Sequence, residues 1–346
     1  MERETVNQEI LKDILHEYDF ASTIIESKQY IEDVVDGRIK FVIGVVLSDE
    51  HHLIIKIFRE DGGTDKERLK IENQSAFSEL LRANGIKTPK RYKSGEKYTT
   101  ERMYKDLSCI VTVEDWCGEE ITEITTDIAY KIGVLMARMH NIAVESEFKI
   151  GCGTLFGAAY ENDVDAYESF CKICENQNLN QGVVSEIKKH REVKLAQLRS
   201  MWESLPKAAT QGDISINNLV WENNELTMFD YNNAGDEVLV SDLVLEGLLT
   251  AYEMELADGT PLEYRKQLFP SLLRGYLSTR KLSDAECVAA WEIYTLYNGL
   301  WFTKVLYNEN SLDKLVSAEK YDDANKLLYQ MLIDITEPND GRFRGI

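Results

Sequence analysis

Two short apolar segments separated by a polar turn constrain this chain more than any other feature. The segments are residues 219–221 and 226–229, and Asn223-Asn224 lies between them. Apolar and β-branched residues on both sides of an Asn-rich turn predict a β-hairpin. Because the two open ends of a hairpin lie side by side, the pattern also brings together the residues just outside it.

Three polar residues flank this hairpin. Asp213 lies in the loop before it, Asn218 lies where the loop enters the first strand, and Asp230 follows the second strand. We expect the three to converge. Two carboxylates and an amide form the set that phosphoryl transfer needs, since one carboxylate orients the attacking hydroxyl while the others hold Mg²⁺. The alternative is that these residues only form turns, which Asp and Asn favour for backbone reasons.

The same residues carry a family resemblance. Gly212-Asp213-x4-Asn218, followed by Phe229-Asp230-Tyr231, resembles the motif of the aminoglycoside phosphotransferase and choline kinase superfamily. Gln211 stands where the family usually has His. The resemblance extends from about residue 35 to about residue 310 and implies that Asp213 is the catalytic base, with Asn218 and Asp230 as metal ligands.

The resemblance implies an α+β, two-lobed, protein-kinase-like fold. We expect a small lobe over residues 1–113, with an N-terminal helix, an antiparallel sheet and one further helix. A hinge follows at 114–119. The large lobe, residues 120–346, is expected to be mainly helical and to carry the catalytic loop at 211–231. The apolar runs at 23–25, 41–47, 53–58 and 109–113, which are rich in β-branched residues, agree with the sheet.

Lys56 lies within the apolar strand pattern of residues 53–58. A buried Lys is costly unless it is paired, although a half-exposed strand permits a solvent-facing Lys. The resemblance implies that Lys56 contacts the α- and β-phosphates of a nucleotide. Its partner stays open. By resemblance, a Glu of the following helix would pair with the Lys. The matching position, counted back from Gly85, is Gln74, and Glu72 and Glu79 are the alternative partners.

The expected hinge contains Glu114 and Trp116. By resemblance, its backbone would bind the adenine, and we therefore predict that Glu114 and Trp116 lie at the nucleotide site. Core packing is the alternative for Trp116. The sequence does not choose between ATP and GTP.

Several other residues have two interpretations. His140 ends an amphipathic pattern over 127–140 and is predicted to be structural. The aromatic run at 291–302 is predicted to be core, although such rings can also hold a cation. Asp236, Glu237 and Glu246 are candidates for contact with a cationic acceptor.

Composition excludes some classes of function. The chain has 346 residues, 44% of them hydrophobic and 29% charged, and a net charge of −21. Such a charge would repel the phosphates of nucleic acid. It would suit a cationic acceptor, although net charge reflects solubility more than a particular site. No apolar run is long enough to span a membrane and the first residues do not resemble a signal peptide, so we expect a cytoplasmic protein without membrane contact.

Together these patterns predict a Mg²⁺-dependent kinase that moves the γ-phosphoryl group of ATP or GTP to a hydroxyl of a small molecule, with an amino-bearing acceptor favoured. The main alternative is a catalytically inactive kinase-like nucleotide-binding or scaffold protein, which Gln211 and Gln74 keep open. Transfer to a protein side chain ranks lower, because no activation segment follows Asp230. A purely structural role for the motif is the third alternative.

Overall fold

The structure is a computed structural model that describes residues 6–35, 37–59, 65–154, 157–158, 164–214, 216–222 and 224–345. Asn223, one of the two predicted hairpin-turn residues, lies outside these ranges. The chain forms two compact units. The first comprises Met1–Ile121, Phe148–Cys152 and Asn217–Ala234, and the second comprises Thr122–Glu147, Gly153–Ile216 and Gly235–Ile346.

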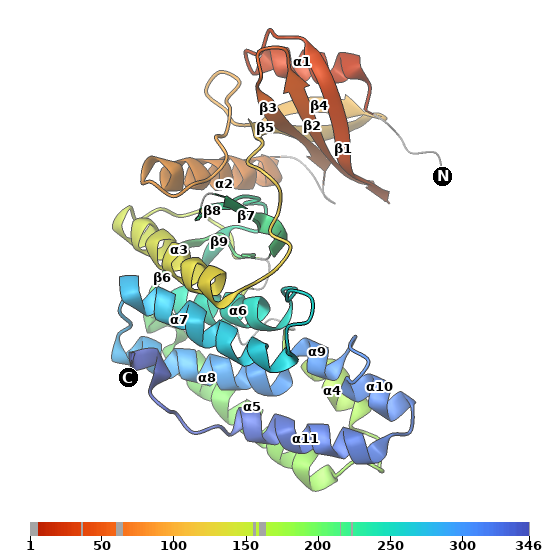
Figure 1. The fold of residues 1–346 in the computed structure, drawn as a ribbon, viewed down its shortest axis with the longest axis vertical. Helices are drawn as coiled ribbons and strands as arrows, with labels where there is room; N and C mark the ends of the chain where they lie inside the picture. Colours follow the sequence, from red (N-terminus) through yellow and green to blue (C-terminus); the bar gives the residue numbers. More distant parts are fainter. Residues whose placement is uncertain are drawn as a thin grey trace. The chain divides into compact units, whose positions relative to one another are not determined.

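The first unit is built on a five-stranded antiparallel sheet (Figure 1). Its strands are β1 (Ile24–Val35), β2 (Arg38–Leu47), β3 (His52–Arg59), β4 (Thr100–Tyr104) and β5 (Leu107–Asp115), in the order β1-β2-β3-β5-β4. The sheet confirms the predicted strands and adds β4. That strand lies at an edge and alternates half-buried with exposed residues, so it lacks the apolar signal of a central strand.

One face of this sheet is covered by helix α1 (Gln8–Glu17). Alternate residues of β2, from Ile39 to Leu47, are buried in one cluster with Leu11, Ile14 and Leu15 of the helix. Leu53, Ile55 and Ile57 of β3 belong to the same cluster. Since successive side chains of a strand point to opposite faces, Lys56 points away from α1.

The rest of the first unit comprises helix α2 (Asp65–Ala83) and the predicted hairpin. The hairpin strands are β7 (Leu219–Glu222) and β8 (Glu225–Met228), which pair in antiparallel register. The Met228 N–H donates to the Lys87 carbonyl (3.0 Å), which joins the hairpin to the chain that leaves α2. Phe77 of α2 stacks on Phe148 and meets Tyr231 edge to face.

The second unit is mainly helical. It contains α3 (Thr126–Glu145), α4 (Tyr167–Ile173), α5 (Gln181–Met201), α6 (Leu239–Tyr252), α7 (Leu268–Thr279), α8 (Asp284–Leu300), α9 (Phe302–Val305), α10 (Leu312–Ser317) and α11 (Tyr321–Ile335). Helices α5, α8 and α11 pack together (Figure 1). None of the helices in the described ranges combines the length and the apolar content needed to cross a membrane.

A two-stranded ladder supports the loop before the hairpin. Strand β6 (Lys207–Thr210) pairs with β9 (Gly235–Val238) in antiparallel register, with Thr210 opposite Gly235. The loop that begins at Gln211 continues from β6. Helix α6 packs against both strands, so the loop starts from a buried part of this unit.

Helix α3 extends beyond His140, where the sequence predicted its end. The amphipathic pattern predicted that the helix stops at His140, but α3 continues to Glu145. The imidazole is fully buried. Its Nε2 lies 2.9 Å from Asp242 Oδ2, and its Nδ1 lies 2.8 Å from the Tyr276 hydroxyl. Both ring nitrogens have partners inside the helical unit, which agrees with a structural role.

The aromatic run of α8 also belongs to the core. Trp291, Tyr297 and Trp301 are buried, as predicted. The guanidinium of Arg342 lies 5.0 Å from the centre of the Trp291 ring and 4.9 Å from that of Tyr294. These rings therefore hold a cation of the chain itself.

Candidate functional site

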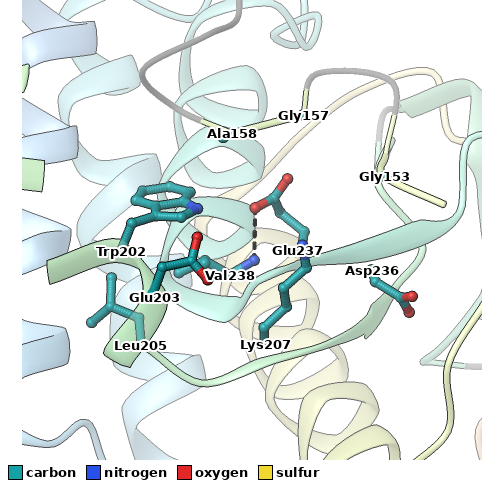
Figure 2. A pocket seen from close by; sticks show the side chains of 10 residues that line it. All are labelled: Gly153, Gly157, Ala158, Trp202, Glu203, Leu205, Lys207, Asp236, Glu237 and Val238. Atoms are coloured by element: carbon teal, nitrogen blue, oxygen red, sulfur yellow. Dashed lines mark hydrogen bonds between the residues drawn. The ribbon is translucent and has the colours of Figure 1, made fainter. Parts of the chain in front are cut away.

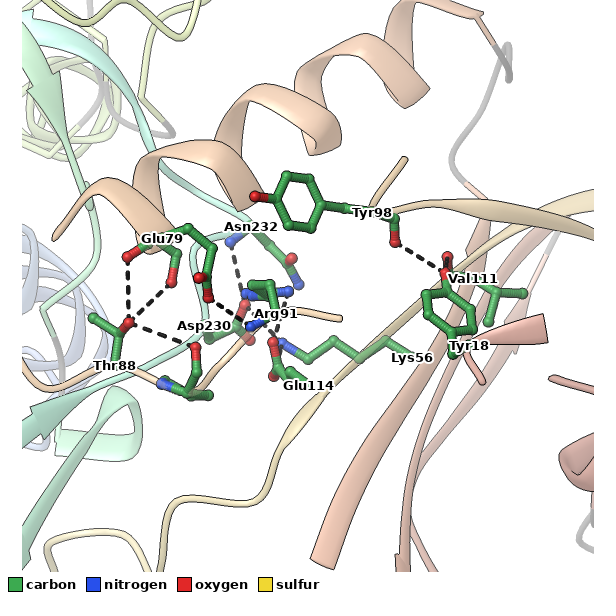
Figure 3. A network of polar contacts seen from close by, with 12 residues as sticks. Tyr18, Lys56, Glu79, Thr88, Arg91, Tyr98, Val111, Glu114, Asp230 and Asn232 are labelled. Carbon is green, nitrogen blue, oxygen red and sulfur yellow. Dashed lines mark hydrogen bonds and ion pairs between the residues drawn. The ribbon is translucent and has the colours of Figure 1, made fainter. Parts of the chain in front are cut away.

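The site in the first unit begins with Lys56 (Figure 3). The residue lies opposite Val42 of β2 and Thr112 of β5, in the middle of the sheet. Its side chain is only 7% exposed, yet Nζ lies 3.0 Å from Glu114 Oε1 and 3.4 Å from Asp230 Oδ1. The sheet therefore presents an ammonium group that two carboxylates stabilise.

Glu114 is shared between two cations. Its Oε2 lies 2.6 Å from Arg91 Nη1, while its Oε1 faces Lys56. The side chains of Glu114 and Arg91 are as buried as that of Lys56. With Asp230, the cluster has two positive and two negative groups, so its charges balance. Removing one member of such a buried set leaves an uncompensated charge and typically costs about 3–5 kcal/mol.

The structure answers the question of which residue pairs with Lys56. Glu72 accepts the N–H groups of Tyr98 and Thr99, and Glu79 accepts from Arg82 and from the Arg91 N–H. The partners of Lys56 are Glu114, which the sequence assigned to the hinge, and Asp230. The ladder places Thr112 opposite Lys56, and Glu114 is two residues further along the same face of β5.

Gln74, which the sequence offered as a partner of Lys56, instead bonds to the backbone. Its side chain is buried, and its amide nitrogen donates to the carbonyl oxygens of Asn232 (2.8 Å) and Ala234 (2.9 Å). Only a side chain with an N–H donor can serve two carbonyl groups in this way. Gln74 thus fixes the segment that follows Asp230.

Asp230 lies just beyond the end of β8, in a left-handed backbone conformation with φ of 52°. Asp tolerates this region better than most residues. Its Oδ1 accepts the Asn232 N–H (3.2 Å). Burial raises the pKa of the Asp230 carboxyl, but Lys56, this N–H and more distant cations outweigh burial and lower it below the ordinary value. The group is therefore a carboxylate at neutral pH.

Asn218 lies at the other open end of the hairpin. It is buried, and its carbonyl accepts the Phe229 N–H (3.0 Å), which continues the ladder by one position beyond Leu219 and Met228. Asp230 is the next residue after Phe229. The hairpin thus brings the backbone at Asn218 beside that at Phe229, and the convergence of the Asn218 and Asp230 side chains stays a prediction. An amide and a carboxylate are oxygen donors of the kind that Mg²⁺ prefers.

Asp213 belongs to the second unit, in the loop that follows β6. Its N–H donates to Gln211 Oε1 (2.8 Å), and the Ile214 N–H donates to Glu246 Oε2 (2.7 Å). Gly212, with φ of 74°, makes the turn between Gln211 and Asp213. Lys56, Asn218 and Asp230 are thus described within one unit, and the convergence of Asp213 with them stays a prediction.

Both expected hinge residues, Glu114 and Trp116, make contacts within the first unit. The carboxylate of Glu114 faces Lys56 and Arg91. The Trp116 backbone N–H donates to the His52 carbonyl (2.9 Å), and the exposed Trp116 side chain lies near the His52 ring. A role of Glu114 and Trp116 in nucleotide binding stays a prediction.

A pocket of about 300 Å³ opens in the second unit (Figure 2). Its lining includes Trp202, Glu203, Lys207, Asp236 and Glu237. Burial is the main cause that raises the pKa of Glu237 to about 7, although the Val238 N–H donates to its carboxyl.

Two of the three candidate acceptor-contact residues, Asp236 and Glu237, line this pocket. The third, Glu246, is fully buried and accepts from the loop backbone.

Sequence reasoning missed Arg91 and the role of Glu246. Arg91 is a cation that follows shortly after the end of α2. The sequence does not show that this segment runs beside β5, which only the backbone β-bridge between Arg91 and Glu114 reveals. Glu246 lies in a nearly continuous apolar stretch of α6, where an unexplained carboxylate is itself a signal of a buried partner.

No family model matches the sequence, and no curated protein matches it. Solved structures do resemble it. An amicoumacin kinase, in complex with AMP-PNP and Ca²⁺, aligns over 96% of this chain and 96% of its own, with a TM-score of 0.59 and 15% identity. An aminoglycoside phosphotransferase from Alicyclobacillus acidocaldarius aligns over 96% and 98%, with a TM-score of 0.59 and 12% identity.

A microcompartment-associated aminopropanol kinase gives a TM-score of 0.56 over 95% of both chains, at 14% identity. At these identities the likeness concerns the fold. The chain has the two-lobed, protein-kinase-like fold that the sequence predicted, with an antiparallel sheet in one part and helices in the other.

The role of Gln74 gives a first prediction. Gln74→Glu removes two donated hydrogen bonds and turns a carboxylate oxygen toward two carbonyl oxygens. We expect a loss of about 2–4 kcal/mol in the free energy of unfolding, measured by chemical denaturation. Gln197→Glu, on the exposed side of α5, is the control and should change stability by less than about 0.5 kcal/mol. An unchanged or increased stability of Gln74→Glu would mean that a Glu there pairs with Lys56 after all.

The pocket gives a second prediction. The pKa of Glu237 rises from an ordinary 4.5 to about 7 on folding. Between these values the folded state holds a proton that the unfolded state has lost, so the stability contribution falls as pH rises from 4.5 to about 7. The unfolding free energy of the wild type should fall by up to about 3 kcal/mol relative to Glu237→Gln over this range. Parallel pH profiles of the two proteins would contradict the assignment.

Proposed function

We propose that this protein is a small-molecule kinase of the aminoglycoside phosphotransferase and choline kinase type, which transfers the γ-phosphoryl group of ATP or GTP to a hydroxyl group. The observation that carries the proposal is the buried ammonium of Lys56, which lies between Glu114 and Asp230 on the sheet of a kinase-like fold. The motif Gly212-Asp213-x4-Asn218 and the adjacent hairpin support it.

The chain's own residues fit a nucleotide and its metal. Lys56 Nζ makes ion pairs but has no partner in hydrogen-bond geometry among the described residues, so its N–H groups suit phosphate oxygens. Asn218 and Asp230 supply the two oxygen donors. Bound Mg²⁺ would neutralise charge on the β- and γ-phosphates. Glu114 and Trp116 would lie beside the nucleobase, in the hinge segment between a small lobe of residues 1–113 and a large lobe from residue 120.

The proposed reaction is an in-line displacement. Asp213 accepts the proton of the acceptor hydroxyl while the hydroxyl oxygen forms a bond to the γ-phosphorus. The bond between this phosphorus and its bridging oxygen breaks, and the nucleoside diphosphate leaves. Lys56 holds the phosphates in place, and Glu114 fixes Lys56. Catalysis on this account consists of positioning and charge stabilisation.

We propose an alcohol that also bears an amino group as the acceptor. The similar structures include an aminopropanol kinase and an aminoglycoside phosphotransferase, whose names refer to such compounds. The net charge of −21 suits a cationic molecule through long-range attraction. Fold alone does not give the substrate, so a panel of amino alcohols and aminoglycosides is the first screen.

A thermal-shift experiment tests the nucleotide site. The wild type should gain in Tm with millimolar ATP or GTP in the presence of Mg²⁺, because a ligand of the folded state stabilises it. Asp230→Asn should lose the part of this gain that depends on Mg²⁺. Asp236→Asn, which removes a carboxylate of the second-unit pocket, is the control and should keep it.

The outcomes separate the alternatives. No shift of the wild type with either nucleotide would contradict the kinase proposal. A shift that depends on Mg²⁺, without phosphoryl transfer to any acceptor of the panel, would favour the nucleotide-binding scaffold.

A further inference from the structure

Glu246 is a fully buried carboxyl group in α6 that the reaction described so far does not use. Its Oε2 accepts the Ile214 N–H at 2.7 Å. Ile214 directly follows Asp213, and its own side chain is fully buried. Helix α6 therefore holds the loop through a direct bond, one residue away from the proposed base.

The backbone is held on both sides of Asp213. Its own N–H donates to Gln211 Oε1, and the next N–H donates to Glu246. Gln211 is fully buried as well, and Gly212 supplies the left-handed turn between them. Two consecutive amides thus point to acceptors within the second unit, which restricts the directions available to the Asp213 side chain.

We propose that Glu246 is a positioning residue for phosphoryl transfer, which fixes the loop backbone at Ile214 and through it the carboxylate of Asp213. This inference rests on the function proposed above. A displacement of about 1 Å in a catalytic group can lower a rate by about 10²-fold. Loss of the bond at Ile214 should therefore act on turnover while leaving the nucleotide site of the first unit intact.

Burial favours the neutral form of the Glu246 carboxyl group. Burial is the largest cause that raises its pKa well above the ordinary value, and Asp242 and Asp213 raise it further. Asp242 lies one turn earlier in α6, and its carboxylate faces His140 of α3. Glu246 Oε1 has no hydrogen-bond partner among the described residues. One oxygen then accepts from Ile214 while the other carries the proton.

A neutral carboxylic acid and a carboxamide have the same shape and each offers one accepting oxygen. Glu246→Gln is therefore the rescuing variant, and Glu246→Leu, of similar size without an acceptor, is the disrupting one. We expect kcat of Glu246→Leu to fall about 10- to 100-fold while KM for the nucleotide changes less than about threefold. Glu246→Gln should keep kcat within about threefold of the wild type.

Amide hydrogen exchange on the same three proteins provides a readout that does not need activity. Exchange of the Ile214 amide should accelerate in Glu246→Leu and stay slow in Glu246→Gln, because only the Leu variant lacks an acceptor for this N–H.

Each result then has one meaning. Unchanged kcat and slow exchange in Glu246→Leu would overturn the proposal. Equal losses in both variants would also overturn it, because they would show that the ionised carboxylate is required. If the wild type transfers no phosphoryl group, the proposed function fails, and the exchange data still decide whether Glu246 holds the loop.

Discussion

The first unit depends on one electrostatic constraint, which is the placement of a Lys ammonium inside a β-sheet. An isolated charge there would be prohibitively costly, so the surroundings must supply compensation. Glu114 and Asp230 supply it for Lys56, and Arg91 balances the second oxygen of Glu114. The position of Asp230 in turn depends on the hairpin and on the carbonyl groups that Gln74 fixes. The four charges compensate one another within the protein, as the proposed phosphate site would require.

The second unit solves a different problem, because it must hold a polar loop against a hydrophobic helix. Two side-chain acceptors, Gln211 and Glu246, satisfy the amides around Asp213. The pair His140 and Asp242 lies in the same interior, where α3 and α6 meet. Most buried polar groups in folded proteins have a hydrogen-bond partner, as Gln211, His140 and Asp242 do here. Residues 211–214 are thus anchored to the helical core.

The sequence predicted the elements whose signals are local. Short apolar runs predicted the start of β1 and the strands β2, β3 and β5, and the turn between residues 219 and 229 predicted the hairpin. It did not predict β4, because an edge strand with exposed residues carries no such signal. Lys56 was identified, but its partner was not, because strand register decides which carboxylate lies beside it. Register and long-range pairing are properties of the folded chain, so Arg91 and the role of Glu246 were also missed.

The most direct test is ³¹P NMR of ATP with Mg²⁺ in the presence of this protein. The account predicts that the wild type shifts or broadens the β- and γ-phosphate resonances, since Lys56 and the hairpin residues would contact these groups. Lys56→Met, which keeps the length of the apolar stem, should lose most of this effect while its circular dichroism spectrum shows that it is folded. Resonances that are identical with and without the wild-type protein, both at millimolar ATP and at millimolar GTP, would contradict the central claim.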